Sequence, residues 1–199
     1  PFTSYGLLKT IRSHQISSPS VASARATGRP TACNLCHVDK TLAWTGEYLA
    51  QWYGQAKPAL DEPDVSSALL LALTGDAGQR AIAAQAMGWK PAQEASGTDW
   101  MLPHLAQLLD DPYDAVRFIA GRSLRSLPEF NNFEYDFAAP IEHRRDAQRR
   151  VMTTFTRVRA RLPRPGDPRL LLTPEADVDV SRTLALLKQR NNRNMLLRE

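Results

Sequence analysis

Apolar residues recur every three or four positions over most of this chain, which predicts a mainly α fold. The clearest single stripe lies in residues 39–54, where Tyr48, Leu49 and Trp52 recur at helical spacing and Gly54 is placed to end the helix. This predicted helix directly follows Cys33, Cys36 and His37, so its placement affects any site that these three side chains form.

Between residues 61 and 128 the same periodicity predicts four helices, at 64–74, 77–87, 100–109 and 113–127. They pair into two helical hairpins, which form a degenerate internal repeat of about 35 residues. The second copy, LAQLLDDPYDAVRFIAGRSLRSL, resembles a HEAT repeat, with an apolar helix, an acidic turn and V-R-x-x-A-x-x-S-L. In that motif the acidic turn and the arginine tie neighbouring hairpins together, here through Asp111 or Asp114 and Arg117. Because two repeats are fewer than a free solenoid needs, the flanking segments are expected to cap them.

The segments on either side of the hairpins carry weaker signals. Residues 1–32 are predicted to be irregular, with a brief strand or turn near Tyr5 and an extended loop at 17–30 that is rich in Ser, Ala, Gly and Pro. After the hairpins we expect an aromatic irregular connection at 129–142, a basic helix at 141–161 and a last helix at 175–190. Three parts result: an irregular N-terminal segment, the HEAT-like hairpins and a C-terminal helical extension, at 1–60, 61–128 and 129–199.

The distinctive chemistry lies in Cys33-Asn34-Leu35-Cys36-His37, a C-x-x-C-H sequence that is typical of covalent c-type haem attachment. Two thiols separated by two residues reach the two vinyl groups of a porphyrin, and the next residue then lies beneath the iron, where the histidine donates Nε2 as the proximal ligand. The chain has two cysteines in all. The sequence therefore predicts one haem c in the segment 1–60, attached to Cys33 and Cys36 with His37 on the iron.

Other uses of the two cysteines are less well supported and stay as alternatives. A structural zinc site needs four ligands, whereas the chain offers two thiolates. A thioredoxin-like dithiol is expected after a strand in a βαβ unit, which the pattern of this chain lacks. Trp44, Tyr48 and Trp52 are expected to pack on the macrocycle, with an ordinary helix core as the alternative.

The second axial ligand decides between electron transfer and ligand chemistry at the iron. The candidates are His14, His104, His143, Met87, Met101, Met152 and Met195. His14 lies in a loop segment that can fold over the open haem face, which keeps it among the candidates. His104 is expected to be structural within a helical repeat, His143 to be solvated at the start of the basic helix, and Met87 to belong to the core.

Residues 13–54 resemble a segment of bacterial multihaem c-type cytochromes of the cytochrome c554/c-prime-like kind, in which tetratricopeptide or HEAT repeats often follow. That segment reads D-H-x-F-x-x-P, a small-residue loop, P-N-A-C-x-x-C-H-x-D-K-x-x-x-W and a W-Y-G ending. The matching positions here are His14, Pro19, Pro30, Ala32, Cys33, Cys36, His37, Asp39, Lys40, Trp44, Trp52, Tyr53 and Gly54. At position 13 a serine stands where the family has the aspartate that would orient the histidine.

The resemblance implies that His14 is the second iron ligand, which gives a bis-histidine haem, or else that it binds a neighbouring haem. It also implies an exported bacterial protein of the periplasm or the cell exterior, because thioether attachment takes place outside the cytoplasm. Further haems are then expected on residues that precede Pro1 or on a neighbouring chain. The partners would be redox proteins or other multihaem cytochrome chains, within a larger assembly.

Composition changes this picture little. The formal charge is +4, the sequence pI is about 9.3 and the arginines are scattered, which argues against a nucleic-acid binder. The basic surface is expected to be solvated or to dock an acidic redox partner. A membrane-spanning helix needs about 18 or more consecutive apolar residues, and the chain contains no such stretch. No signal peptide is visible, so the sequence is expected to be a processed mature chain or a piece of a longer one.

Three functions are compatible with these features. Electron transfer through a six-coordinate haem is favoured, with the helical repeats as a docking scaffold. A structural or interaction subunit, in which the haem is mainly a fold staple, is the main alternative. A haem enzyme, such as a peroxidase or a reductase of nitrogen oxides, is less favoured because residues 10–54 offer no convincing acid–base set. The chain is therefore expected to be an electron carrier and not an enzyme.

Overall fold

The computed structural model describes residues 2–6, 8–12, 17–160 and 165–193, and within them the chain is mainly helical, as the sequence predicts. The α-helices are α1 (Val21–Thr27), α2 (Ala32–Cys36), α3 (Leu42–Tyr53), α4 (Ser67–Thr74), α5 (Ala77–Met87), α6 (Lys90–Ser96), α7 (Met101–Leu108), α8 (Asp114–Leu124), α9 (Ile141–Arg159) and α10 (Val180–Leu187). Short 3-10 turns lie at η1 (Pro128–Phe130) and η2 (Pro168–Leu170). Among the described residues no helix combines the length and the apolar character that crossing a membrane requires.

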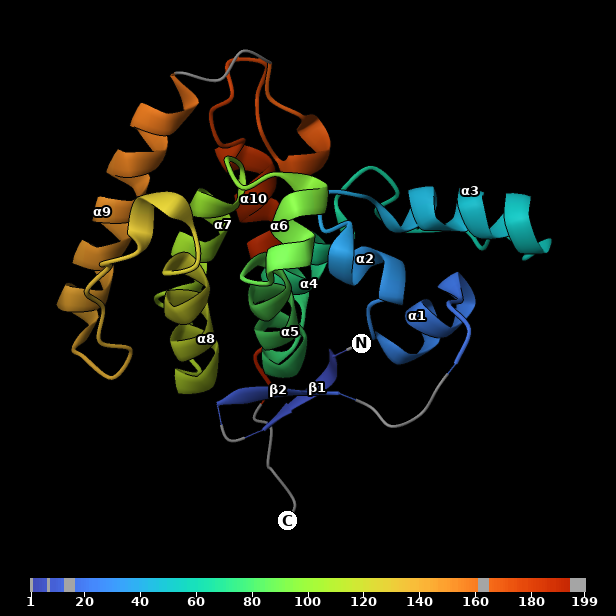
Figure 1. Ribbon diagram of the computed structural model, residues 1–199, viewed down its shortest axis with the longest axis horizontal. Helices are drawn as coiled ribbons and strands as arrows, with labels where there is room; N and C mark the ends of the chain where they lie inside the picture. Colours follow the sequence, from blue (N-terminus) through green and yellow to red (C-terminus); the bar gives the residue numbers. More distant parts are fainter. Residues whose placement is uncertain (1, 7, 13–16, 161–164, 194–199) are drawn as a thin grey trace.

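Helices α4, α5, α7 and α8 form the centre of the molecule (Figure 1). Helix α4 packs on α5, α7 packs on α8, and α5 also packs on α8, so the two predicted hairpins are joined through their second helices. Asp76 and Gln79 form a reciprocal capping box at the start of α5, which satisfies backbone donors that the helix itself leaves unpaired. All four predicted helices are present, and each begins and ends within about three residues of its expected ends.

An ion pair that is closed to solvent joins the two hairpins. Arg80 donates from Nε and Nη2 to the two carboxylate oxygens of Asp111, at 2.7 and 3.0 Å, and neither side chain is exposed. Arg117 instead donates to the backbone carbonyl of Asp111 and pairs with the Asp114 carboxylate, and both partners belong to its own hairpin. Arg80 and Arg117 are each the fourth residue of their helices, so equivalent positions of the two hairpins carry the same side chain. The predicted tie thus involves Asp111, but its partner is Arg80 and not Arg117.

Three segments flank this centre on the C-terminal side. The connection after α8 is irregular, as predicted, and buries Phe130 and Phe133 against each other with ring centroids 5.3 Å apart. Helix α9 packs on α7, and α10 packs on α4. Helix α10 begins at Val180, five residues later than residue 175, because the chain first closes a bridge between Leu172 and Val178.

The N-terminal part contains more regular structure than its composition indicates. Strands β1 (Phe2–Gly6) and β2 (Lys9–Arg12) pair as an antiparallel hairpin, and β1 lies against α5. The segment 17–30, predicted as an extended loop, contains α1, because Ser20 caps its start and Gly28 ends it in the left-handed conformation. The segment 90–99, which lies between two of the predicted helices, contains α6, because its proline lies in the first helical turn, where no backbone donor is lost.

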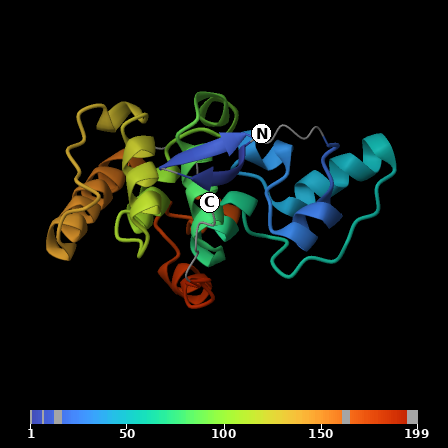
Figure 2. The same ribbon diagram turned by 90° about the horizontal axis from the view of Figure 1, so that it is seen from below.

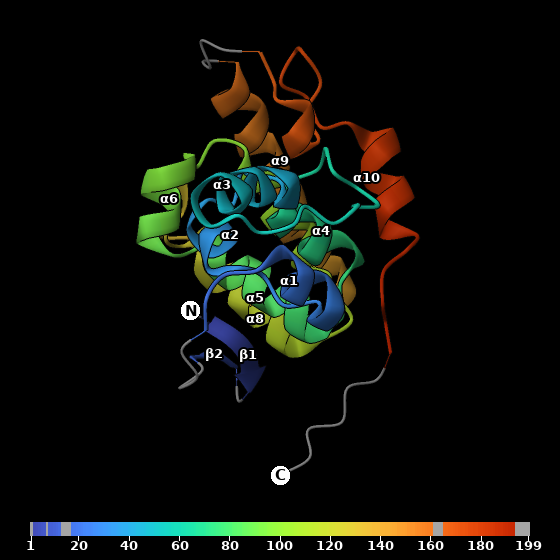
Figure 3. The same cartoon turned by 90° about the vertical axis from the view of Figure 1, so that its right-hand side faces the viewer.

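Helices α1, α2 and α3 form an arm that extends from one side of the hairpins (Figures 1 and 2). Seen from that side, the arm lies in front of α4 and α5 (Figure 3). Helix α2 is the part nearest the centre and packs on α6, α4 and α5, whereas α3 packs on α1 and α2. Leu35 of α2 and Val38 after it belong to the main apolar core, so the C-x-x-C-H sequence lies where the arm joins the core.

Candidate functional site

Cys33, Cys36 and His37 occupy the end of α2, a single short helix. Thr31 caps its start by accepting from the backbone N–H of Asn34 at 3.2 Å, and the N–H of His37 donates to the carbonyl of Cys33 at 2.8 Å. The two cysteines are separated by three positions, which places them on neighbouring parts of one helix face. Both thiols and the imidazole are partly exposed, and the two sulfurs are not joined to each other.

The two residues between the cysteines point the opposite way. Asn34 is 1% exposed and Leu35 is 4% exposed, so the middle of the motif is buried while its chemically distinctive side chains reach the surface. The carbonyl of Cys36 accepts from the hydroxyl of Ser96 at 3.1 Å, which ties the end of α2 to α6. The motif is therefore anchored from behind and open in front, and this arrangement suits attachment of a large group through the sulfurs.

The turn that follows His37 is fixed to the start of α4. Val38 is fully buried, and its carbonyl accepts from the Ser66 hydroxyl at 2.6 Å. The N–H of Ser67 donates to the carbonyl of Lys40 at 3.0 Å, and the Lys40 ammonium pairs with Asp39 at 2.5 Å. His37 thus lies between two segments whose backbones are both held by the core.

The second oxygen of Asp39 distinguishes this turn from an ordinary one. Asp39 Oδ1 is buried and has no hydrogen-bond partner among the described residues. A buried acceptor without a donor is costly unless another group reaches it, so such atoms often mark functional sites. Asp39 follows His37 by two residues in the chain, and a carboxylate is one of the usual acceptors for the remaining N–H of a metal-bound imidazole. Asp39 Oδ1, together with the open thiols and imidazole, fits a haem held by this segment.

Aromatic rings continue outward from His37 along α3. The ring centroids of His37 and Trp44 are 5.1 Å apart, those of Trp44 and Tyr48 are 4.9 Å apart, and those of Tyr48 and Trp52 are again 4.9 Å apart. Exposure rises along this row, from a partly buried Trp44 to 37% for Tyr48 and 60% for Trp52. The structure thus brings Trp44 to the imidazole, and it places Trp52 two rings further out, without contact to His37.

The remaining ligand candidates differ in their surroundings. His14 and Met195 lie outside the described residues. His104 is buried and its Nε2 lies 2.9 Å from the Leu170 carbonyl, and burial lowers the pKa of this imidazole to about 4. Met87 and Met101 are fully buried in the apolar core, as predicted for Met87. His143 is exposed at the start of α9, also as predicted.

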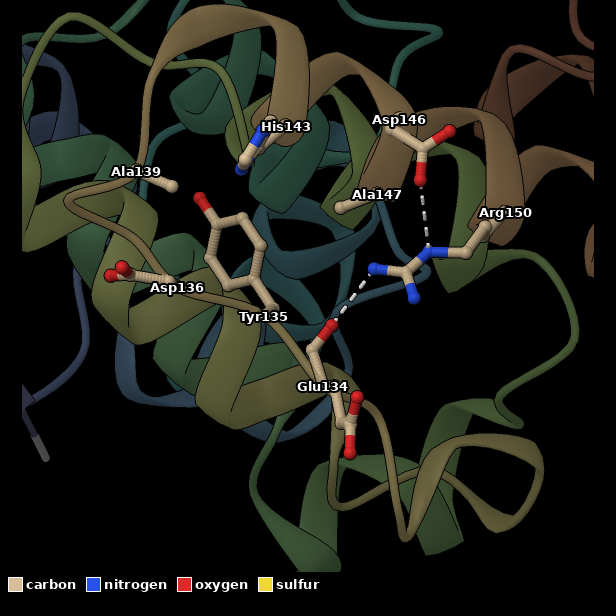
Figure 4. A pocket seen from close by; sticks show the side chains of 8 residues that line it. All are labelled: Glu134, Tyr135, Asp136, Ala139, His143, Asp146, Ala147 and Arg150. Atoms are coloured by element: carbon tan, nitrogen blue, oxygen red, sulfur yellow. Dashed lines mark hydrogen bonds and ion pairs between the residues drawn. The ribbon is translucent and has the colours of Figure 1, made fainter.

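His143 lines a polar hollow of about 570 Å³ between α9 and the connection that precedes it (Figure 4). Arg150 is paired within it: it donates to the Glu134 carbonyl at 2.9 Å and pairs with Asp146 at 3.6 Å. The Tyr135 hydroxyl donates to the Leu109 carbonyl at 2.6 Å, and burial raises its pKa. The lining of this hollow includes neither of the cysteines nor His37.

No family model, curated protein or solved structure matches this chain. The assignment of a function therefore depends on the geometry of the site itself.

Two alternatives can be weighed against that geometry. Within the described residues, no group of three or more His, Cys, Asp or Glu side chains is placed to hold a metal ion, whereas a structural zinc site uses four ligands. Burial, and then the neighbouring Cys33, raise the pKa of the Cys36 thiol, which is the opposite of the activation that a reactive dithiol needs.

Sequence reasoning identified the cysteines and His37 but not the residues that hold them. Asn34, Thr45 and Ser66 are buried polar residues that fix the motif and the turn after it. The sequence carried one signal for this role: a polar residue inside the motif, followed by threonines and serines at the starts of helices. That signal is weak without the fold, because exposed caps have the same residue types.

Proposed function

We propose that this chain is an exported electron-transfer protein that carries one haem c, attached to Cys33 and Cys36, with His37 as the proximal iron ligand. The observation that carries the proposal is the orientation of α2. Both thiols and the imidazole face outward from one helix turn, while Asn34 and Leu35 between them are buried. When bound, the haem would supply one-electron chemistry between ferric and ferrous iron.

The chain's own residues would do three things for this function. Cys33 and Cys36 would hold the macrocycle in one orientation through two bonds on neighbouring positions of α2. His37 would donate Nε2 to the iron, and the unpartnered Oδ1 of Asp39 would be the acceptor for the other ring nitrogen. Trp44, which contacts the imidazole, would keep water away from it and maintain dry surroundings that tune the potential.

His14 is proposed as the second iron ligand. Two imidazoles would leave the iron without an open position for substrate, so the haem would pass electrons and would not act on a small molecule. The HEAT-like hairpins would provide the docking scaffold for redox proteins or other multihaem chains. The contacts of Asp111 support the repeat interpretation, because Arg80 and Arg117, which occupy equivalent positions of the two hairpins, both donate to this residue.

The decisive experiment is mass spectrometry of the intact chain purified from an exporting bacterium with haem-attachment machinery. We expect the polypeptide mass plus one haem, and sharp α and β bands in the reduced spectrum that do not shift on addition of CO. The variant with both Cys33→Ser and Cys36→Ser should lose the added mass and the colour. Colourless wild-type protein whose two thiols react freely with an alkylating reagent would overturn the proposal.

One observation favours a structural role for the haem as the second candidate. Residues 17–60 bury four hydrophobic side chains, those of Val21, Leu35, Val38 and Leu49. A segment with so little apolar burial gains much from a large apolar group. If the haem is mainly a fold staple, its removal should disorder the arm, whereas disturbing the iron ligands with the thioethers intact should leave assembly with partners unchanged.

A further inference from the structure

Asn34 makes the densest set of hydrogen bonds in the arm. Its Oδ1 accepts from the hydroxyls of Thr31 and Thr45, each at 2.8 Å. Its Nδ2 donates to the carbonyls of Lys40 and Thr41, at 3.1 and 3.4 Å. Two accepted and two donated bonds use the full capacity of a side-chain amide. The side chain is 1% exposed, so water does not supply any of these partners in its place.

The two ends of this amide have different effects. The Nδ2 end connects α2 to the turn after the motif, so it closes a ring of chain, from residue 34 to residues 40 and 41, that contains Cys36 and His37. The Oδ1 end connects α2 to the middle of α3 through Thr45, which is fully buried. The first end therefore fixes the place of the imidazole relative to the two sulfurs, and the second fixes the helix that carries the aromatic row.

We propose that Asn34 is a positioning residue for the iron: through Nδ2 it holds the turn that carries His37 at a fixed place relative to Cys33 and Cys36. This inference depends on the proposed function, because it concerns the same haem. The sulfurs fix the macrocycle and the turn fixes the imidazole, so the link between α2 and the turn sets how firmly Nε2 is presented to the iron. A looser turn gives a weaker proximal bond.

The chain offers a pair of near-isosteric substitutions that separate the two ends of the amide. Asn34→Asp keeps an oxygen that accepts from the threonine hydroxyls, but it removes both N–H donors and places a carboxylate oxygen against two carbonyls. Thr45→Val removes one hydroxyl from Oδ1 and leaves the Nδ2 end intact. Both variants disturb the same buried network, so a general loss of stability is common to them and a change at the iron is not.

The test uses the haem-bearing protein, with the covalent haem of each variant verified by mass. For Asn34→Asp we expect an increase of about tenfold in the high-spin ferric EPR signal and in the rate of CO binding to the ferrous form, as for loss of an outer hydrogen bond to a metal ligand. For Thr45→Val we expect the wild-type signal and CO behaviour, with lower resistance to urea. If Asn34→Asp does not accumulate, the uncharged Asn34→Ser replaces it, since its hydroxyl is too short to reach the turn.

Two results would overturn the inference. One is a haem-bearing Asn34 variant whose spectrum and CO behaviour equal those of the wild type. The other is a Thr45→Val variant that changes the iron as much as the Asn34 variant does, which would assign Asn34 to fold stability alone. Both differ from failure of the proposed function, in which the wild-type chain itself carries no haem mass.

Discussion

Residues 17–60 and residues 65–127 are stabilised in different ways. The first segment buries four hydrophobic side chains and, in Thr31, Asn34, Thr41 and Thr45, as many polar ones. The second segment buries mainly apolar side chains, along every helix from α4 to α8, together with one ion pair and a few other polar groups. Among the residues whose burial is described, the exposed Tyr and Trp side chains are those of Tyr48, Trp52 and Tyr53, and all three lie in the first segment.

The difference indicates which part of the molecule can fold by itself. Burial of apolar surface contributes about 25 cal/mol per Å², and the hairpins bury enough of it to form a core without any added group. In the arm, Val21 and Leu49 lie outside the main core and pack between α1 and α3. The arm is therefore positioned by hydrogen bonds, and we expect it to depend on whatever binds to its cysteines.

Removal of both thioethers should have the largest effect on this contrast. In the variant with Cys33→Ser and Cys36→Ser we expect hydrogen exchange in α1 and α3 to accelerate by orders of magnitude. In the haem-bearing protein, local opening of these helices has to break their contacts with the haem, and the variant lacks this free-energy cost. Exchange in α5 and α8 should stay slow. Amide exchange read by mass spectrometry makes the comparison, and the single variant Cys36→Ser, which retains one thioether, is the control. Equal protection of the arm with and without haem would contradict the contrast.

Disruption of the buried ion pair should destabilise the hairpins and leave the haem site unchanged. Asp111→Asn leaves Arg80, and Arg190 beside it, without a carboxylate in a buried place, so the free energy of unfolding should fall by about 3–5 kcal/mol. The haem spectrum should not change, because the site is held by other residues. Urea unfolding measures the loss.

Asp146→Asn is the matched control for that substitution. Asp146 pairs with Arg149 and Arg150 on the surface of α9, where 55% of its side chain is exposed. Its replacement should cost at most about 1 kcal/mol. A loss for Asp111→Asn as small as for this control would mean that the hairpins do not depend on their buried tie.

The two segments also differ in how far their sequences reveal them. The hairpins show helical periodicity, and the predicted helix at 77–87 begins and ends where the structure places α5. In the arm, α1 was missed because Ser, Gly and Pro around it suggested a loop, although Ser20 and Gly28 are its caps. Local composition does not show whether a serine caps a helix or lies in a loop, since that depends on what the helix packs against.

The candidate site shows the same limit in another form. Spacing alone singles out Cys33, Cys36 and His37 as candidates, because the proposed haem attachment would require this spacing. The partners of Asn34 are up to eleven residues away, and Ser66 reaches Val38 from 28 residues away. Such contacts follow from tertiary packing and cannot be predicted from spacing. Asn34 therefore stands at a variable position of the C-x-x-C-H sequence, although its side chain makes four hydrogen bonds in the fold.

A pH-dependent effect of intermediate size is expected from His104 in the core. Its pKa is lowered by burial from 6.5 to about 4, so between these values the unfolded chain binds more protons than the folded one. Stability should therefore rise with pH over this window, by about 3 kcal/mol in all, and should be level above it. Urea unfolding of wild type and His104→Gln between pH 4.5 and 7 measures the difference.

Glutamine is a suitable replacement because its amide can still donate to the Leu170 carbonyl without titrating. The variant should lose this part of the pH dependence and retain the part that carboxylates contribute. Parallel plots of unfolding free energy against pH for the two proteins would show that His104 binds a proton in the folded protein at its ordinary pKa. Our conclusion that this ring is enclosed in the core would then be wrong.

The smallest effects are expected within the aromatic row, and they test how far the haem environment extends along α3. Trp44→Ala removes the ring that contacts His37, so it should shift the haem reduction potential and cost about 1 kcal/mol of stability. Trp52→Ala removes a side chain that is 60% exposed and two rings away, so stability should change by less than about 0.5 kcal/mol and the potential should not move.

Protein-film voltammetry on the two variants decides between two views of the row. A shift confined to Trp44→Ala would mean that the environment of the iron ends at the first ring, and that our sequence-based expectation of haem packing applies to Trp44 but not to Trp52. Equal shifts for both would place the macrocycle along the whole exposed face of α3. In that case the exposed rings of the arm are haem contacts, and the arm with its haem attached has an apolar core of its own.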